Sequence, residues 1–479
     1  MEVFVMIKKH LFINGEWTKA KRYTNLLSPY DREVIAEVPS ATVEEVELAI
    51  EAAYQTRQIM ADMPSHQRAK ILENLAHLLE QRAEEAAVII STESSKPLKD
   101  ARGEVTRTIQ TYKFAAEEAK RIGGETIPMD AAPGGEGKIA YTVREPLGVV
   151  GAITPFNFPM NLVAHKVGPA IASGNTVVLK PAGQTPLSAY FLAELIQEAG
   201  LPSGAFNVVT GSGSVVGEKL VKDERVKKIS FTGSPEVGIG IKNKVGLKHV
   251  TLELGSNAAL IVDKNIDIEK IIRRCVTGAF SSQGQVCISL QRIYVHKDLY
   301  DFFVESFVKE TGNLTIGNPL DPRTDVSALI HPKEIERTLA WIEEAKQKGA
   351  VVATGGVNEG NILKPTVLLG VSPLSKVSCQ EVFAPIVLIN KVDTVDEAIE
   401  LVNDSRYGLQ AGIYTENIHT AIHASKKLQV GGVLVNDIPT FRVDHMPYGG
   451  VKESGIGREG IKYAIKEMTE QKLVIFNNN

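Results

Sequence analysis

Short apolar runs alternate with helix-like segments along two long stretches of the sequence, and this alternation limits the possible folds more than any other feature. Strands that follow one another through helices form a mostly parallel sheet with helices on both faces. Residues 146–255 therefore predict a doubly wound α/β lobe, whose ligands bind at the carboxyl ends of its strands. The predicted elements are the strands Val149–Thr154, Thr176–Lys180, Asn207–Val209, Lys228–Phe231 and His249–Leu254, and the helices Pro186–Ala199 and Val215–Val221.

Residues 258–435 predict a second α/β lobe of the same kind, and the two lobes meet near residue 255. Helix 186–199 of the first lobe has the clearest boundary signals, with Thr185 as the expected N-cap, Pro186 in the first turn and Gly200 just past the end. The predicted elements of the second lobe are the strands Ala259–Val262, Arg292–His296, Ile386–Lys391 and Val433–Asn436, and the helices Ile268–Ser281, Leu299–Thr311, Pro332–Lys348 and Val395–Asn403.

The remaining segments predict a helical layer and a projecting ribbon. Residues 11–39 predict short strands and turns, and residues 42–122 carry apolar side chains at helical spacing. Residues 123–145 combine a Gly/Pro-rich segment with an alternating strand, and Lys472–Phe476 predicts a short strand at the chain end. Two such strand edges favour pairing with another subunit, so we expect a homo-oligomer, a dimer or a tetramer.

Composition and charge narrow the class of partner. Of the 479 residues, 43% are hydrophobic, which is enough for large cores, and the net charge of −4 gives no electrostatic footprint for nucleic acid or for an anionic membrane. Residues Met1–His10 lack the pattern of a secretory signal, and no apolar run is long enough to span a bilayer. The three cysteines form no CxxC pair, which disfavours disulfides and a cysteine metal site. We expect a cytoplasmic protein with no metal and a small-molecule substrate.

Three residues near the predicted lobe boundary each admit two interpretations. Cys287 lies among small and polar residues between a helix and a strand, where it is either an exposed nucleophile or a small buried hydrophobic residue. Glu253, at the end of a predicted strand, is either an acid on a solvated face or a general base in a cleft. Asn157 lies between two prolines, and its amide either donates to an oxyanion or forms an Asx turn.

Two glycine patterns in the first lobe each follow a strand and open a helix, namely Gly211–Gly217 and Phe231–Gly238. Backbone N–H groups at such a turn can bind a pyrophosphate. However, Gly211–Gly217 departs from the usual Gly-x-Gly-x-x-Gly spacing, and a tight turn needs glycine without any ligand. Each pattern by itself leaves both interpretations open.

Seven short motifs occur in a fixed order along the chain, and together they are far more specific than any one alone. They resemble the aldehyde dehydrogenase superfamily over nearly the whole chain. Within this superfamily, the sequence most resembles the lactaldehyde and non-phosphorylating glyceraldehyde-3-phosphate dehydrogenase branch. The resemblance implies oxidation of an aldehyde to the carboxylic acid with NAD or NADP. The motifs are Pro155–Pro159, Lys180–Ala182, Phe231–Ser234, Glu253–Gly255, Gly284–Cys287, Glu381–Pro385 and Pro447–Gly455.

The resemblance also assigns roles to residues. Cys287 is then the nucleophile, Glu253 the general base, and Asn157 with the Cys287 backbone N–H the oxyanion hole. The thioester left after hydride transfer is hydrolysed by water that Glu253 activates. The expected cofactor-binding residues are Thr154, Pro155, Phe156, Lys180, Gly183, Gly213, Gly217, Phe231, Thr232, Gly233, Ser234, Leu254, Glu381 and Phe383.

The expected domains follow the same scheme. Residues 1–122 and 146–255 form a Rossmann-like cofactor domain, residues 256–436 a catalytic domain, and residues 123–145 and 460–479 a small β oligomerisation ribbon. Residues 437–459 form a return segment that lines the active site. Cys275 and Cys379 lie outside the motifs and are expected to be structural.

Departures from the family pattern bear on cofactor and substrate. Gly183 stands where many NAD-specific members have a glutamate, which makes NADP admissible without supplying a new donor, so NAD and NADP both stay open. Residues Gly255–Asn257 and Ala384 also depart from the pattern, and neither departure suggests a function.

The substrate's tail is expected to contact basic residues. Arg107 lies where phosphate-binding members of the branch carry an arginine, and Arg442 and His445 lie in a stretch that resembles the branch. We therefore expect a short hydroxylated or anionic aldehyde, held by charge-assisted hydrogen bonds. The alternative is that each residue is a surface or loop-fixing charge. Val286 also bears on this, since some members that bind phosphorylated aldehydes have a basic residue beside the nucleophile.

Other functions are less consistent with the residues present. Succinate-semialdehyde-type or broad specificity stays open. A coenzyme A-acylating dehydrogenase generally lacks the acid that corresponds to Glu253, and a non-catalytic family member would have no need of Cys287, Glu253 and Asn157 together.

Overall fold

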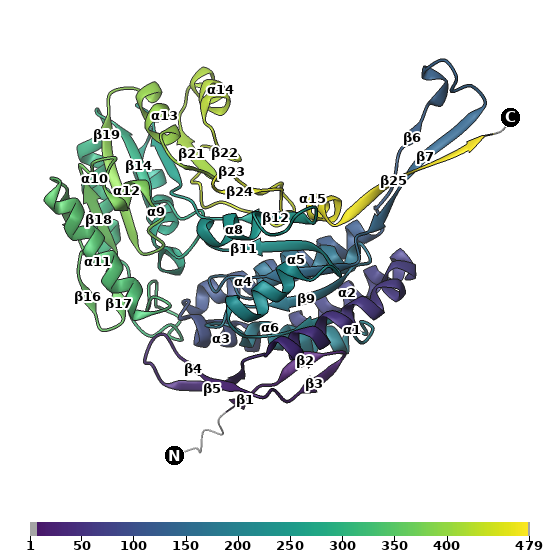
Figure 1. The fold of residues 1–479 in the computed structure, drawn as a ribbon. Helices are drawn as coiled ribbons and strands as arrows, with labels where there is room; N and C mark the ends of the chain where they lie inside the picture. Colours follow the sequence, from purple (N-terminus) through teal and green to yellow (C-terminus); the bar gives the residue numbers. More distant parts are fainter. Residues whose placement is uncertain (1–6, 478–479) are drawn as a thin grey trace.

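A computed structural model describes residues 7–477, so Met1–Met6, part of the segment in which no secretory signal was predicted, lie outside the described residues. Two large sheets, each covered by helices, account for most of the chain, as Figure 1 shows. This confirms the predicted α/β class with two doubly wound lobes. No helix within residues 7–477 is both long enough and apolar enough to cross a membrane.

The first sheet has a parallel centre with antiparallel strands at both edges. The chain runs from its middle strand to two strands on one side and then to two on the other, which creates a topological switch point. Pairing aligns Ile153 with Lys180 and Thr232 with Glu253, so the carboxyl ends of these strands lie along one edge. The strand order is β24 (Gly455–Ile456), β12 (His249–Glu253), β11 (Val226–Thr232), β8 (Val149–Ile153), β9 (Thr176–Lys180), β10 (Phe206–Val208), β2 (Leu11–Ile13) and β3 (Glu16–Thr18).

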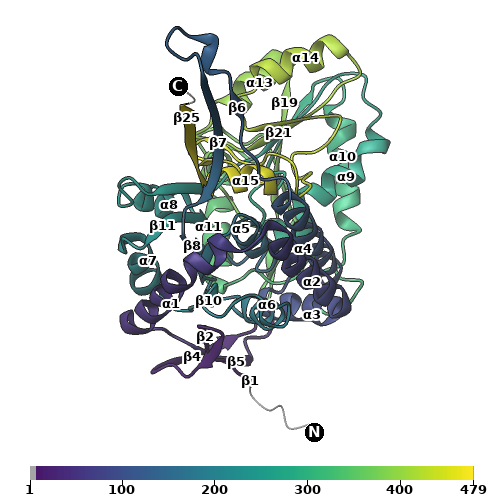
Figure 2. The same ribbon diagram turned by 90° about the vertical axis from the view of Figure 1, so that its right-hand side faces the viewer.

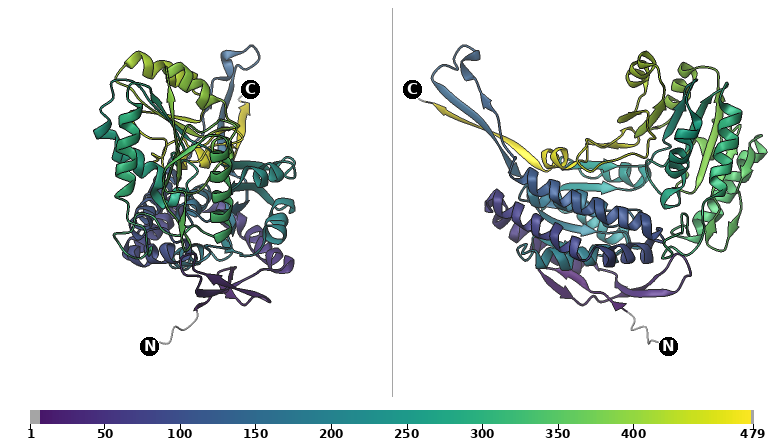
Figure 3. Two further views of the ribbon diagram at one scale, coloured as in Figure 1. Left: turned by 90° about the vertical axis from the view of Figure 1, so that its left-hand side faces the viewer. Right: turned by 180° about the vertical axis from the view of Figure 1, so that it is seen from behind.

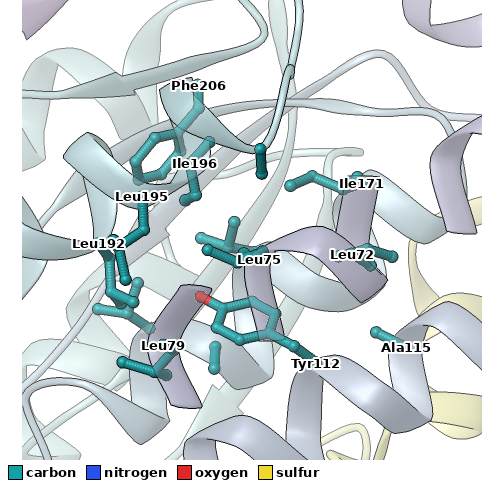
Figure 4. Packing of buried hydrophobic residues seen from close by; sticks show 14 of the residues in the cluster. Leu72, Leu75, Leu79, Tyr112, Ala115, Ile171, Leu192, Leu195, Ile196 and Phe206 are labelled. Carbon is teal, nitrogen blue, oxygen red and sulfur yellow. The ribbon is translucent and has the colours of Figure 1, made fainter. Parts of the chain in front are cut away.

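Two helices pack against this sheet and two more pack against those helices, and Figure 4 shows buried side chains between them. Tyr112 and Leu75 lie in the middle of this core and are fully buried, as are Ile171 and Leu192 from two further helices. The helices are α2 (Ser65–Gln81), α4 (Leu98–Ala119), α5 (Asn161–Ala172) and α6 (Leu187–Glu198), and the neighbouring helices are α1 (Val43–Asp62), α3 (Ala83–Ser94), α7 (Glu218–Lys222) and α8 (Pro235–Lys242).

Two features of this layer differ from the predictions. Helix α5 was not predicted, because all of its residues are buried and no polar face marks its period. Helix α6 does not use Thr185 as its N-cap, because it begins at Leu187 after Pro186. Its free N–H groups instead donate to the buried carboxylate of Glu93, from Leu187 at 2.6 Å and from Ser188 at 3.0 Å. The predicted stop at Gly200 is confirmed, since this residue has a φ of +91°.

The second sheet is parallel except at one edge. Its strand β21 was not predicted although it lies beside β13 in the interior, because Gly412 interrupts the apolar pattern. Strands β15 and β18 and helix α14 were also missed. The strand order is β15 (Val351–Thr354), β18 (Thr366–Leu369), β19 (Ile386–Val392), β14 (Arg292–His296), β13 (Ala259–Val262), β21 (Gln410–Tyr414) and β22 (Gly432–Val435).

Helices cover both faces of the second sheet, seen on the left in Figure 1 and on the right of the rear view in Figure 3. A separate three-stranded sheet lies near the start of the chain. The helices are α9 (Ile268–Phe280), α10 (Tyr300–Gly312), α11 (Pro332–Gln347), α12 (Lys376–Cys379), α13 (Val395–Asn403) and α14 (Ile418–Lys427), and the small sheet contains β1 (Ile7–Lys8), β5 (Val34–Pro39) and β4 (Tyr23–Leu27).

A three-stranded ribbon projects from the rest of the chain, as Figures 1 and 2 show. It contains β25 (Thr469–Asn477), β7 (Lys138–Pro146) and β6 (Thr126–Ile127), and α15 (Ile461–Glu467) leads into it. The two strand edges that favoured pairing with another subunit pair with each other along their whole length. The ribbon still exposes apolar side chains, namely Ile139, Tyr141, Leu473, Ile475 and Phe476.

Candidate active site

A cleft of about 860 Å³ lies where the two sheets meet. One wall comes from the residues that follow β8, β11 and β12, at the carboxyl edge of the first sheet. The other comes from segments that precede β14 and β19, at the amino edge of the second sheet. Since Cys287 precedes β14 and Glu253 ends β12, this meeting of edges brings the two side chains into one cleft.

The loop before Cys287 has an unusual backbone that side chains hold in place. Ser282, Gln283 and Gly284 all have positive φ, at 49°, 57° and 68°. A Cβ on Gly284 would lie only 2.3 Å from the carbonyl oxygen of Ala384, so this position admits only glycine. The Gln283 amide donates to the carbonyl of Ser95 at 2.6 Å and to that of Ala328 at 3.1 Å. The loop is therefore rigid, as a nucleophile's frame requires.

Cys287 is half-buried and packs against a small cluster that contains Val286, Ile288, Leu409 and Tyr448. Its Sγ atom is 2.9 Å from the hydroxyl of Tyr448. Burial raises the pKa of the Cys287 thiol to about 11, although the Tyr448 hydrogen bond opposes this rise. In this setting an ionised sulfur needs a hydrogen-bond donor or a positive charge nearby.

Asn157 is buried and directed at the same loop. Its Nδ2 donates to the carbonyl oxygen of Gln285 at 2.8 Å, two residues before Cys287. A primary amide has two N–H donors, so one remains for another acceptor. Asn157 does not form the Asx turn that was its alternative interpretation, because its hydrogen-bond partner lies on a distant segment.

Glu253 is 3% exposed, and neither of its carboxylate oxygens has a hydrogen-bond partner in the part of the chain that the structure describes. Burial raises the pKa of Glu253 well above its ordinary value, and the negative charge of Glu459 raises it further. A buried carboxylate without partners is costly, and such groups cluster where a protein does chemistry. The interpretation of Glu253 as an acid on a solvated face is wrong.

Glu459 forms the centre of a buried ion-pair cluster next to Glu253. It accepts from Lys166 at 3.0 Å and from Arg442 at 2.9 Å. Burial by itself raises the pKa of Glu459, but the positive charges of Lys166 and Arg442 outweigh burial and hold the pKa below its ordinary value. Lys166 also donates to the hydroxyl of Thr232 at 2.7 Å, which fixes the end of β11.

Asp444 extends these contacts toward the mouth of the cleft. It accepts two hydrogen bonds from the Arg107 guanidinium, at 3.1 and 2.7 Å, and one from Asn161 at 3.0 Å. His165 Nε2 lies 2.8 Å from Asp444 and 3.1 Å from Arg442, so it joins the two groups of charges.

Sequence analysis missed Glu459, Asp444, Lys166 and His165. The buried Arg442 and the half-buried Arg107 each require an acidic partner, but no spacing in the sequence shows which acids these are. His165 and Lys166 lie on helix α5, whose uniformly buried sequence gave no helical period.

The three candidate substrate-tail residues lie in different environments. Arg107 and Arg442 both line the cleft, and Arg107 keeps its Nη1 group free of hydrogen bonds among the described residues. His445 does not line the cleft; its side chain is exposed and its ring lies 4.9 Å from that of Phe114.

Apart from Glu381 and Phe383, the expected cofactor residues lie along the carboxyl edge of the first sheet. Ser234 is the N-cap of α8, and the buried hydroxyl of Thr154 has no hydrogen-bond partner within residues 7–477. Gly183 and Gly213 face open space, since a Cβ at either would meet nothing within 4 Å. Of the set, Pro155, Phe156, Thr232, Gly233, Ser234, Leu254, Glu381 and Phe383 line the cleft, whereas Thr154, Lys180, Gly183, Gly213, Gly217 and Phe231 lie outside its lining.

Lys180 ends β9 and is largely buried. Its only hydrogen bond in the described chain runs to the neighbouring carbonyl of Pro181, at 3.3 Å, and it has no acidic partner. Burial lowers the pKa of Lys180. A buried ammonium group with one weak partner can still donate to a ligand.

Glu381 and Phe383 approach the site from the second lobe. Glu381 accepts from the backbone N–H of Ser256 at 3.0 Å, and burial raises its pKa to about 7. A Cβ on Gly255 would lie 2.5 Å from the Glu381 carboxylate, so a larger residue here would displace that carboxylate. Phe383 has a φ of +51° and packs edge-on against Phe156 across the cleft.

One of the two unexplained departures from the family pattern acquires a structural role. Asn257 is buried and donates to the carbonyl of Ser378 at 2.9 Å. Its side-chain oxygen accepts from Arg292 at 3.2 Å and from Ser405 at 2.8 Å. Asn257 therefore ties the connection between the sheets to the start of β14.

The chain matches known proteins over nearly its whole length. The profile of the aldehyde dehydrogenase family matches residues 17–474. A 3-sulfolactaldehyde dehydrogenase from Priestia aryabhattai is 47% identical over 478 residues, covering 100% of each chain. A lactaldehyde dehydrogenase from Methanococcus aeolicus is 41% identical and covers 98% of this chain and 100% of its own.

Solved structures also match this chain over nearly its whole length. That of an aldehyde dehydrogenase from Physcomitrella patens in complex with the reaction product succinate has a TM-score of 0.97 at 41% identity, covering 99% of each chain. The glyceraldehyde-3-phosphate dehydrogenase GapN from Methanocaldococcus jannaschii, complexed with NADP, has a TM-score of 0.92 at 40% identity. It covers 95% of this chain and 100% of its own.

Proposed function

The chain belongs to the aldehyde dehydrogenase family and is an oxidoreductase that converts an aldehyde to the carboxylic acid with NAD or NADP; on this premise we propose that its substrate is a short hydroxylated or anionic aldehyde. The observation that carries the assignment of residues is the convergence of Cys287, Glu253 and Asn157 on one cleft. They come from three distant segments, and only a shared chemical task explains their meeting.

In the proposed reaction, the ionised sulfur of Cys287 attacks the aldehyde carbon, and the carbonyl oxygen becomes an oxyanion. The free N–H of the Asn157 amide and the backbone N–H of Cys287 donate to this oxygen. NAD or NADP, when bound, supplies the nicotinamide ring that accepts the hydride. Glu253 then takes a proton from a water molecule, and that water hydrolyses the thioester on Cys287.

The environment of Glu253 supports hydrolysis over transfer to coenzyme A. A general base works best when its pKa lies near the working pH, and burial raises the pKa of Glu253 in that direction. Both of its carboxylate oxygens are free of protein partners, so either can receive a proton from water. An acylating dehydrogenase needs no such base.

The carboxyl edge of the first sheet has the groups that a dinucleotide requires. The unpartnered hydroxyl of Thr154, the ammonium group of Lys180 and the N-terminus of α8 at Ser234 all lie at strand ends near the switch point. Open space at Gly183 leaves room for a 2′-phosphate, so we propose that the site accepts NADP as well as NAD.

The substrate's tail is proposed to lie against Arg107 and Arg442. Arg107 can donate from Nη1 while Asp444 holds the other side of its guanidinium. The relatives' names support a negatively charged or hydroxylated tail, since sulfolactaldehyde, glyceraldehyde 3-phosphate and succinate are all anions and lactaldehyde carries a hydroxyl group. His445 is a weaker candidate because it lies outside the cleft lining.

A panel of aldehydes tests this proposal. Turnover of 3-sulfolactaldehyde, lactaldehyde, glyceraldehyde 3-phosphate, succinate semialdehyde and a plain alkyl aldehyde is followed with NAD and with NADP. We expect the best kcat/KM on one of the first four, and we expect Arg107→Gln to raise KM for the anionic members about tenfold or more without affecting the alkyl aldehyde.

The matched control is Arg102→Gln, which removes an arginine from the same helix that pairs with Glu84 at the surface. It should leave every KM unchanged. The best rate on the alkyl aldehyde, or equal KM values in the wild type and Arg107→Gln, would contradict an anion site at Arg107.

We also propose that the chain is a cytoplasmic homo-oligomer, a dimer or a tetramer, with the domain limits given above. The projecting ribbon supports this, because exposed Ile139, Leu473 and Phe476 are unusual on a surface that meets only water. Light scattering of the wild-type chain measures the number of subunits, and light scattering of Leu473→Lys tests whether the ribbon is needed for their association.

A further inference from the structure

Tyr448 occupies a position that none of the proposed steps uses. Within residues 7–477, its hydroxyl is the only side-chain group that lies within hydrogen-bond distance of Cys287 Sγ, at 2.9 Å. Cys287 also packs against a cluster that includes the apolar side chains of Val286, Ile288 and Leu409. A sulfur that loses its proton here therefore has one protein side chain to replace the hydrogen bonds of water.

The Tyr448 ring is held so that its hydroxyl cannot swing away from the sulfur. The residue is 2% exposed, and its backbone pairs with that of Glu459 through hydrogen bonds of 3.1 and 2.7 Å. The Arg442 guanidinium lies 3.7 Å from the centre of the ring, and Glu459 anchors that guanidinium at 2.9 Å. A cation against a buried aromatic face is attractive and fixes the ring.

Burial and the neighbouring charges decide whether the Tyr448 hydroxyl or the Cys287 sulfur donates the hydrogen bond between them. Burial, followed by the neighbouring Cys287, holds the pKa of Tyr448 well above its ordinary value, so the phenol keeps its proton where the thiol loses one. The carboxylates of Glu381 and Glu253 disfavour a thiolate, whereas Arg442 favours it. The sulfur is thus the atom that ionises, and the phenol the atom that donates.

We propose that the Tyr448 hydroxyl donates a hydrogen bond to the Cys287 thiolate and holds the ionised sulfur in position for attack. When the thiol ionises, its proton leaves to water, and the phenol proton stays on the Tyr448 oxygen. Arg442 acts through the ring as a positioning residue. This role rests on the proposed function, in which Cys287 is the nucleophile.

The experiment measures ionisation of Cys287 without any turnover. The full-length protein is alkylated with iodoacetamide between pH 6 and pH 10.5, without aldehyde or cofactor, and the modified Cys287 peptide is quantified by mass spectrometry, apart from Cys275 and Cys379. Only the thiolate reacts, so the rate follows the ionised fraction. Tyr448→Phe should displace the profile upward by about one pH unit, which slows alkylation at pH 8 about tenfold.

Tyr190→Phe is the matched control, because Tyr190 is also buried with a hydrogen-bonded hydroxyl, 2.8 Å from that of Thr210, and lies outside the cleft lining. Its profile should superimpose on the wild type. Replacing Tyr448 alone with 3-fluorotyrosine, a more acidic phenol and stronger donor, should displace the profile downward, and this keeps the test decisive if Tyr448→Phe folds poorly.

A Tyr448→Phe profile that superimposes on the wild type or moves to lower pH would overturn the role of the hydroxyl. So would an unchanged or upward-displaced profile with 3-fluorotyrosine. Since alkylation needs no aldehyde oxidation, a chain that oxidises none of the panel aldehydes still yields the profile, and failure of the proposed function stays a separate result.

Discussion

The two sides of the cleft differ in how many hydrogen-bond partners their polar side chains have. One side contains Cys287 and Glu253, and the other contains Arg442 and Glu459. Within residues 7–477, neither carboxylate oxygen of Glu253 has a hydrogen-bond partner, and Cys287 has one. Glu459 has two cationic partners, and Asp444 accepts from three side chains. Glu253 and Glu459 are equally buried, at 3% and 2% exposed, so the difference between these two acids does not come from exposure.

We interpret the side chains with few partners as those that react, and the ion-paired side chains as those that keep them in position. An unpartnered buried carboxylate destabilises the fold, and it persists only where the surrounding structure fixes it. The ion-paired side provides that support, because each of its charges is compensated within the chain and fixes neighbouring backbone and rings. Changes on the two sides should therefore affect different quantities: turnover on the first, stability on the second.

Removing the sulfur should have the largest effect on turnover. Cys287→Ser replaces it with a hydroxyl that does not ionise in this site, so kcat should fall by about 10⁴-fold or more while the melting temperature stays close to that of the wild type. Steady-state formation of NADH or NADPH measures the first quantity, and circular dichroism the second. Cys275→Ser, which changes a cysteine buried in the second lobe outside the cleft lining, should keep its turnover.

Replacing the unpartnered acid should have the next largest effect. Glu253→Gln cannot take a proton from water, so steady-state turnover should fall about 10²- to 10⁴-fold. A burst of reduced nicotinamide should remain, because hydride transfer precedes hydrolysis. In the wild type, Glu253 must be ionised to act and its pKa is raised, so turnover should decrease as the pH falls through that raised pKa, well above the pH at which an ordinary glutamate titrates.

Stopped-flow absorbance resolves the burst from the steady state. Full steady-state turnover by Glu253→Gln would contradict its role as the base that activates water. The absence of a burst would instead mean that Glu253 acts before hydride transfer.

Breaking the ion-paired side should affect stability most. Glu459→Gln leaves Lys166 and Arg442 buried without their anion, so the free energy of unfolding should fall by about 3–5 kcal/mol. The folded state depresses the pKa of Glu459, so this stabilisation is fully present above the ordinary glutamate pKa of about 4.3, begins to decrease as the pH falls below it, and is lost as the pH falls through the lowered pKa.

Urea unfolding measures this change at neutral pH and at pH 4, where the difference between the two proteins should shrink. The control is Glu80→Gln, which breaks an exposed pair with Lys113 and should change the free energy of unfolding by less than about 1 kcal/mol. Equal effects of the two substitutions would mean that the buried cluster carries no special stabilisation.

The elements that sequence predicted and those it missed differ in their surroundings. Helices with one polar face, such as α11, show their period directly, and Gly200 marks a helix end because few other residues adopt its φ. Helix α5 and strand β21 lie in the interior, where neighbours from distant segments set the conformation and no alternation of polar and apolar residues is required. The cap of α6 likewise comes from Glu93, on another helix.

The sequence by itself determined the two-lobed α/β class and, through seven ordered motifs, the family and the candidate nucleophile, base and oxyanion donor. Local periodicity suffices for the fold class, because it requires no knowledge of distant contacts, whereas the family and the roles of these residues came from the resemblance that the motifs carry. Only the tertiary structure decided which acids neutralise Arg107 and Arg442, that Glu253 has no hydrogen-bond partner among the described residues, that His445 lies outside the cleft lining and that Tyr448 contacts the sulfur. These facts depend on contacts between side chains that are far apart in the sequence. Where such side chains are charged and buried, each charge needs an opposite charge beside it.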